Sequence, residues 1–125
     1  MIVAIGVDSV AIARIEALWR RGGTRFAHRI LTQGELAYCA GRAHPAESMA
    51  GRFCTKEAVM KCLGTGWAEG IGFLQIEVRR DARGAIAIDL DGAAAARAAE
   101  LGIRRWHASL THTADVATAF VIAEA

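Results

Sequence analysis

The sequence ESMAGRFCTKEAVMKCL, residues 47–63, has the spacing of a helix that is apolar on most of its sides. At 100° per residue, one side collects large apolar residues and most of the remainder carries small ones. The large ones are Met49, Phe53, Val59, Met60 and Leu63, and the small ones are Ala50, Gly51, Cys54, Ala58 and Cys62. We therefore expect a long central helix, with Pro45 in its first turn and Gly64 as its left-handed cap.

Four charged residues interrupt this apolar pattern: Arg52, Lys56, Glu57 and Lys61. A charge inside a core is costly unless it is paired or holds a ligand. The chain has thirteen arginines but two lysines, Lys56 and Lys61, so these positions favour a compact ammonium. The alternative is an ordinary surface pair between Glu57 and Lys61, worth about 0.2–0.5 kcal/mol.

The turn after this helix reads Gly64-Thr65-Gly66. Backbone amides of such a small turn can approach a phosphate, which would suit its place beside Lys61. Glycine is equally common in plain helix caps, so the turn alone leaves both interpretations open.

Residues 2–7 are apolar and β-branched, which predicts a buried strand, and the acid Asp8 follows directly after them. Asp8 or Ser9 can cap a following helix. Alternatively, Asp8 and Glu57 together supply the hard carboxylate oxygens that are the usual protein share of a Mg²⁺ site.

The remaining chain alternates between helical and strand patterns. Thr32 and Glu35 have the spacing of a capping box. The class predicted is α+β, with a mainly antiparallel sheet packed against the central helix. The expected elements are helices at about 10–21, ended by Gly22-Gly23, and 93–101, with strands at 73–79, 85–90, 105–111 and 116–124.

Near the end, Trp106-His107-Ala108-Ser109-Leu110-Thr111-His112-Thr113 alternates in character. In a strand, His107, Ser109 and Thr111 share one face, which is either solvated or a ligand wall. We expect His112 to begin the turn, where it can exchange a proton near neutral pH. The spacing disfavours a zinc site.

The first helix predicts a basic stripe through Arg14 and Arg21, continued by Arg25 and Arg29. Such a stripe is either a solvated face or a docking surface for an acidic helix.

Composition narrows the functional classes. The 125 residues carry a formal charge of +2, which does not suggest a nucleic-acid binder, and charges break every apolar stretch before membrane-spanning length. The first residues lack a secretory layout, so we expect a cytoplasmic protein with Cys39, Cys54 and Cys62 as free thiols. An apolar content of 54% in so small a chain predicts an oligomer.

Three ordered motifs carry a family resemblance: Ile5-Gly6-Val7-Asp8, residues 50–66 and His107 to Thr113. They resemble the short, single-domain type of 4′-phosphopantetheinyl transferase, the holo-acyl-carrier-protein synthases. The resemblance covers residues 1–125 as one domain with that family's fold. It implies transfer of the phosphopantetheine arm of coenzyme A to a serine of apo acyl carrier protein, releasing adenosine 3′,5′-bisphosphate, in fatty acid biosynthesis.

The resemblance also implies residue roles. Asp8 and Glu57 hold Mg²⁺, and Lys61 neutralises phosphate charge. The serine's proton acceptor stays open among Glu57, a metal-bound water and His112. Coenzyme A is bound by Arg52, Lys61, Gly64, Thr65, Gly66, Ser109, Thr111 and His112. The carrier protein docks on Arg14, Arg21 and Arg25.

The family resembled is typically a homotrimer with active sites between protomers. In this sequence Cys54, Thr55 and Cys62 replace the family's usual alanines, beside the implied ligating positions. The main alternative is a coenzyme A-binding module that has lost catalysis. A metal-dependent phosphodiesterase would need more convergent acids than the sequence offers.

Overall fold

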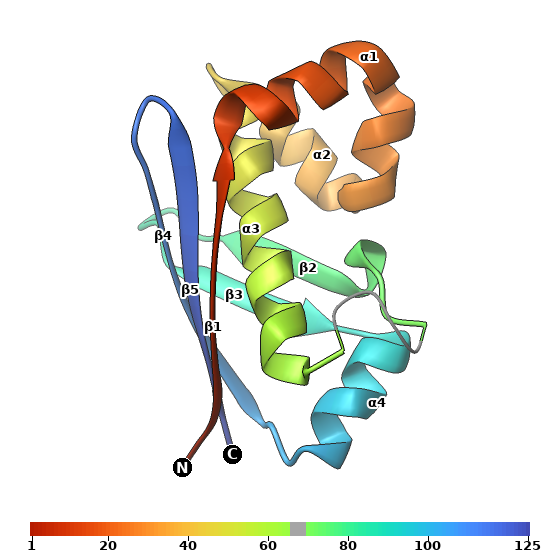
Figure 1. The fold of residues 1–125 in the computed structure, drawn as a ribbon, viewed down its shortest axis with the longest axis vertical. Coiled ribbons are helices and arrows are strands. Elements are labelled where there is room, and N and C mark those ends of the chain that lie inside the picture. The colour runs from red at the N-terminus through yellow and green to blue at the C-terminus, as the bar shows by residue number, and fades with distance from the viewer. Residues whose placement is uncertain (66–69) are drawn as a thin grey trace.

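The computed structural model describes residues 1–65 and 70–125. Its main sheet contains three antiparallel strands in the order β1-β5-β4, so β1 and β4 form the two edges (Figure 1). Their bounds are Ile2–Ala11 for β1, Arg105–His112 for β4 and Val116–Glu124 for β5. The inward face of β5 is lined by Ala117, Ala119, Val121 and Ala123, all buried. These small side chains let a helix approach the sheet closely.

Helix α3, Pro45–Leu63, lies along this inward face. Pro45 occupies its first turn and Gly64 ends it with a φ of 74°, so both expected signals are confirmed. A Cβ atom on Gly6 would lie 2.1 Å from the carbonyl oxygen of Ala58. Strand β1 and helix α3 therefore touch backbone to backbone at Gly6, and only glycine fits there.

We expect Gly6→Ala to destabilise the protein by about 3 kcal/mol, because β1 and α3 must separate to admit the methyl group. Urea denaturation of the two proteins measures the difference. Gly72→Ala is the matched control, since a Cβ there meets no atom within 4 Å. Equal midpoints for the Gly6 variant and the wild type would contradict this packing.

The first half of the chain corrects one expected helix boundary and confirms two others. Strand β1 continues to Ala11, which pairs with Val116, so Asp8 and Ser9 lie inside the strand instead of capping a helix. Helix α1, Ile12–Ile30, consists of two helical segments joined at Gly23, whose φ of 53° and ψ of −136° are not helical, so the expected break at Gly22-Gly23 is confirmed. The capping box is confirmed at the start of α2, Gln33–Ala40.

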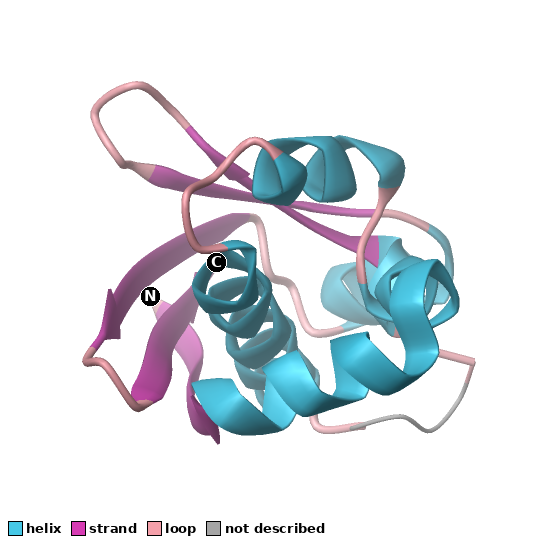
Figure 2. Cartoon of the chain, turned by 90° about the horizontal axis from the view of Figure 1, so that it is seen from above, coloured by secondary structure: helices cyan, strands magenta, loops and turns pink. Residues whose placement is uncertain are grey.

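A second antiparallel sheet pairs β2, Ile76–Arg80, with β3, Ile86–Leu90. The expected strand start at residue 73 is wrong, because Phe73–Gln75 forms a 3₁₀ turn, η1. Helix α4, Gly92–Glu100, then leads to β4. Figure 2 shows α3 between the main sheet and the other helices, with the hairpin to one side. The predicted α+β class with antiparallel sheets is confirmed.

Candidate functional site

Asp8 and Lys61 meet at the β1 edge of the main sheet. Asp8 lies on the face of β1 that packs against α3. The ammonium of Lys61 donates to the carbonyl oxygen of Val7 at 2.8 Å and lies 3.3 Å from Oδ1 of Asp8. The Lys61 side chain is 54% exposed and that of Asp8 19%, so the pair is open to a ligand.

Glu57 projects from the same side of α3 as Lys61, one helical turn earlier. Cys54 lies one further turn back along α3 and is close to Asp8. The pKa of the Cys54 thiol is raised to about 12, mainly by burial and in addition by the negative charge of Asp8. Asp8 therefore lies along the stretch of α3 between Cys54 and Lys61, from which Glu57 extends. We call Asp8, Glu57 and Lys61 the carboxylate edge.

The three cysteine thiols should be unreactive. Burial raises the pKa of Cys62 to about 11 and also raises that of Cys39. Because the thiolate is the reactive form, we expect an aromatic disulfide reagent to label none of the three cysteines in the native protein at pH 8. All three should react in guanidinium chloride, and rapid native labelling of Cys54 would contradict its position.

The turn after α3 follows the carboxylate edge. The backbone N–H of Gly64 donates to the carbonyls of Met60 and Lys61, and Nε of Arg97 on α4 donates to the carbonyl of Leu63 at 3.0 Å. Thr65 is half-buried. Gly66, a predicted coenzyme residue, lies outside the described residues.

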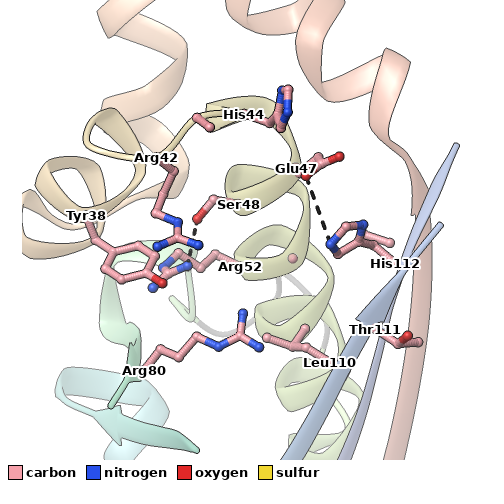
Figure 3. Close-up of a pocket in the computed structure, with 13 residues that line it drawn as sticks. Tyr38, Arg42, His44, Glu47, Ser48, Arg52, Arg80, Leu110, Thr111 and His112 are labelled. Atoms are coloured by element: carbon pink, nitrogen blue, oxygen red, sulfur yellow. Dashed lines mark hydrogen bonds and ion pairs between the residues drawn. The ribbon is translucent and has the colours of Figure 1, made fainter. Parts of the chain in front are cut away.

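A cavity of about 180 Å³ opens at the other edge of the sheet, beside β4 (Figure 3). Arg52 from α3, Arg42 from the loop before α3, and Arg80 from β2 line it. The guanidinium carbon of Arg52 lies 4.3 Å from the centre of the Tyr38 ring. That stacking holds the guanidinium plane in place. We call these residues, with His112, the arginine cavity.

Arg52 is the best-fixed member of the arginine cavity. It is 4% exposed, and its Nη1 donates to Oγ of Ser48 at 3.0 Å. Its Nε is buried without a hydrogen-bond partner among the described residues. A buried, unpartnered N–H in a cationic cavity favours an anionic ligand.

His112 and Thr111 also line the arginine cavity. His112 is the last residue of β4 and its Nε2 lies 4.0 Å from Glu47. The predicted alternation of β4 is confirmed, because Ser109 and His107 are exposed on the outer face. Ser109 therefore points away from the inward face of the sheet, while His107 contacts Glu124 at 2.9 Å.

The carboxylate edge and the arginine cavity lie on opposite sides of α3. Arg52 and Lys61 are nine residues apart, which at 100° per residue is two and a half turns. The two groups also lie at opposite edges of the sheet, β1 and β4. The structure thus separates the predicted coenzyme residues within one chain.

The sequence did not reveal Tyr38, Arg42 and Arg80 as site residues. They come from α2, a loop and β2, and no spacing along the chain connects them. The segment from Lys56 to Lys61 did indicate the carboxylate edge, because it holds both lysines of a chain that otherwise uses arginine.

The predicted basic stripe is exposed on α1, but the kink at Gly23 separates Arg25 from Arg14 and Arg21. The guanidinium carbon of Arg14 lies 5.9 Å from the ring centre of Phe53. Phe53 precedes Glu57 by one helical turn, so the stripe begins beside the carboxylate edge.

Ammonium and carboxylate groups at an exposed sheet edge, with guanidinium groups in a separate cavity, are typical of an α+β protein that binds a phosphorylated ligand. The profile of the 4′-phosphopantetheinyl transferase superfamily matches residues 4–121. The chain belongs to that superfamily.

Individual relatives agree with this membership. The holo-[acyl-carrier-protein] synthase of Nitratidesulfovibrio vulgaris (strain DP4) is 49% identical over 124 residues, covering 99% of both chains. The crystal structure of the Neisseria meningitidis holo-[acyl-carrier-protein] synthase has a TM-score of 0.89 at 37% identity, covering 100% of both chains. The Helicobacter pylori synthase, solved in complex with coenzyme A, has a TM-score of 0.84 at 32% identity, covering 97% of this chain and 100% of that one.

Proposed function

We infer that this chain is a holo-[acyl-carrier-protein] synthase, which transfers the 4′-phosphopantetheine arm of coenzyme A to a serine of apo acyl carrier protein. The observation that carries this conclusion is the 49% identity with such a synthase over 99% of both chains, and the carboxylate edge between β1 and α3 agrees with it. We further propose that residues 1–125 act as one transferase domain, in the cytoplasm and in support of fatty acid biosynthesis. None of the described helices is both long and apolar enough to cross a membrane.

Asp8 and Glu57 fit a magnesium ion. Glu57 offers hard oxygens from α3 and Asp8 offers them from the neighbouring strand β1, where its side chain is partly open to solvent. Within residues 1–65 and 70–125 no group of three or more histidine, cysteine or acidic residues could hold a metal. Mg²⁺ is commonly held by one or two carboxylates together with water and substrate phosphates. Bound there, it would supply positive charge to the coenzyme's diphosphate.

Residues of the chain stabilise the charge that develops in the transfer and accept the proton of the serine. The carrier's serine oxygen bonds to the phosphorus next to the pantetheine, and the bond from that phosphorus to the bridging oxygen breaks. Lys61 stabilises the negative charge that develops on this oxygen of the departing adenosine 3′,5′-bisphosphate. We assign the serine's proton to the carboxylate of Glu57, the closest acid along α3.

Coenzyme A bridges two protomers in this proposal, because the carboxylate edge and the arginine cavity face away from each other in one chain. The carboxylate edge of one protomer and the arginine cavity of the next, with its Thr111 and His112, form one site. Such a head-to-tail contact forms a ring when the rotation between neighbouring copies closes. We propose that the ring is the homotrimer typical of the family that this chain resembles.

The outer face of the main sheet supports assembly. Ile5 and Val7 of β1 are 56% and 51% exposed, and Phe120 of β5 is 43% exposed. Val7 is paired with Phe120, so their side chains form one apolar area. Burying it against neighbouring copies would stabilise the ring.

Intact-mass spectrometry of an apo acyl carrier protein tests the transferase function. Incubation with this protein, coenzyme A and Mg²⁺ should add one phosphopantetheine group to the carrier. The inactive coenzyme A-binding module predicts coenzyme binding without that mass increase. Absence of the adduct on several apo carriers, with coenzyme binding retained, would favour the module.

We propose that the basic stripe docks the carrier protein, because Arg14 stands beside the carboxylate edge. Arg14→Glu and Arg21→Glu should each raise the KM for the carrier about tenfold and leave that for coenzyme A within about twofold, through like-charge repulsion. Arg104→Glu, exposed outside α1, is the control. Equal increases in both KM values would contradict the docking assignment.

A further inference from the structure

Lys56 is the largest fully buried side chain among the described residues, although lysine is normally a surface residue. Its ammonium donates to three acceptors: Oε1 of Glu35 at 2.5 Å, and the carbonyls of Ile30 at 2.6 Å and Phe73 at 3.0 Å. An ammonium has three protons, so each one is used. Burial lowers the pKa of Lys56, and the charge of Glu35 opposes that effect.

The acceptors of Lys56 come from three different elements. Ile30 ends α1, Glu35 lies in the first turn of α2, and Phe73 begins η1. The three bonds therefore connect α3 to α1, α2 and η1. Arginine does not suit this place. Its planar fork spreads its N–H donors apart, whereas the three acceptors here converge on a single nitrogen.

Glu35 extends the network toward the hairpin. Its Oε1 also accepts from the backbone N–H of Thr32, and its Oε2 accepts from the N–H of Val78 at 2.8 Å. The hydroxyl of Thr32 donates to Oε2 of Glu77 at 2.6 Å. The capping box of α2 thus also serves as the buried counterion of Lys56.

A second contact fixes the same stretch of α3. Phe73, whose carbonyl binds Lys56, stacks its ring on Phe53 with centroids 5.4 Å apart. Phe53 lies one turn before Glu57 and also contacts Arg14. The stretch of α3 around residues 53–57 is therefore held by both a charged and an aromatic contact.

We propose that Lys56, held by Glu35, is a positioning residue that sets the rotation of α3 and so the direction in which the adjacent Glu57 reaches toward Asp8. Neighbouring residues on a helix differ by 100°, so a fixed Lys56 fixes the direction of Glu57. This inference rests on the proposed function of Glu57 as a metal ligand. Groups that orient ligands typically change metal affinity by about 10–100-fold when removed.

Binding of Mn²⁺ as a Mg²⁺ substitute, followed by electron paramagnetic resonance with coenzyme A present, tests the proposal. Lys56→Met should weaken Mn²⁺ binding about tenfold, and coenzyme A binding in a chelator should stay within about twofold of wild type. Lys56→Arg keeps the positive charge beside Glu35 but not the three convergent bonds, and it should give the same result. It carries the test if Lys56→Met does not fold.

Ile103→Ala, a core substitution outside the carboxylate edge and the arginine cavity, is the control and should leave Mn²⁺ binding unchanged. Unchanged Mn²⁺ affinity in the Lys56 variants, or equal weakening of Mn²⁺ and coenzyme A, would reduce Lys56 to a structural residue and overturn the proposal. Glu57→Gln is measured in parallel. If it retains wild-type Mn²⁺ affinity, the metal role of Glu57 fails, and the positioning proposal fails with it.

Discussion

Glu57→Gln should lower kcat for transfer to the carrier by at least about 100-fold, because a neutral amide replaces the carboxylate to which we assign both metal binding and proton transfer. In our assignment Glu57 both holds Mg²⁺ and accepts the serine proton, so one substitution removes both contributions. Steady-state kinetics with saturating coenzyme A and carrier measure kcat directly. The Mg²⁺ concentration for half-maximal activity should also rise.

Asp89→Asn is the matched control, since it removes a carboxylate that pairs with Arg79 on the exposed hairpin, outside the carboxylate edge and the arginine cavity. It should keep kcat within about twofold of wild type, as expected for a surface pair. A Glu57→Gln enzyme with wild-type kcat and unchanged Mg²⁺ dependence would remove the carboxylate edge from the chemistry.

Mixing two inactive variants should restore activity. Asp8→Asn damages the carboxylate edge, and Arg52→Ala damages the arginine cavity. If a site takes one half from each of two protomers, some mixed interfaces combine two intact halves. With equal amounts and random assembly, each half is intact with a probability of one half. About a quarter of the sites should then be functional.

The control for this mixture is the double variant that carries Asp8→Asn and Arg52→Ala in one chain, mixed with either single variant. Every interface then contains a damaged half, and activity should stay at the level of the single variants. Subunits must be exchanged by partial unfolding and refolding before the assay. If the first mixture also remains inactive after verified exchange, each site lies within one protomer.

Part of the site could be predicted from sequence because local chemistry signalled it. The two lysines of a chain rich in arginine indicated that α3 carries functional residues. Their environments differ, because Lys56 is buried against Glu35 and Lys61 is exposed beside Asp8. The alternative of a simple Glu57–Lys61 surface pair missed that Lys61 also contacts β1. Periodicity correctly predicted α3 and the alternation of β4, since both depend on neighbours along the chain.

Features that depend on distant partners could not be predicted. Pairing with β5 extends β1 through Asp8 to Ala11, where local propensity favoured a helix cap. The arginine cavity combines side chains from α2, α3, β2 and β4, and its Tyr38–Arg52 stacking exists only after these elements pack. Helical geometry alone places Arg52 and Lys61 on opposite sides of α3. That they also lie at opposite edges of the sheet, β4 and β1, depends on the strand order, which the sequence does not show.

The placement of half-sites on opposite sides of α3 has a consequence for gene dosage. In our proposal a protomer on its own holds no complete site, so turnover would follow the population of assembled rings rather than of chains. Near the dissociation constant of the ring, halving expression would lower cellular activity by more than half. In the same proposal, a folded subunit defective in both halves would inactivate the two sites that it shares with its neighbours, whereas a subunit defective in one half would inactivate only one.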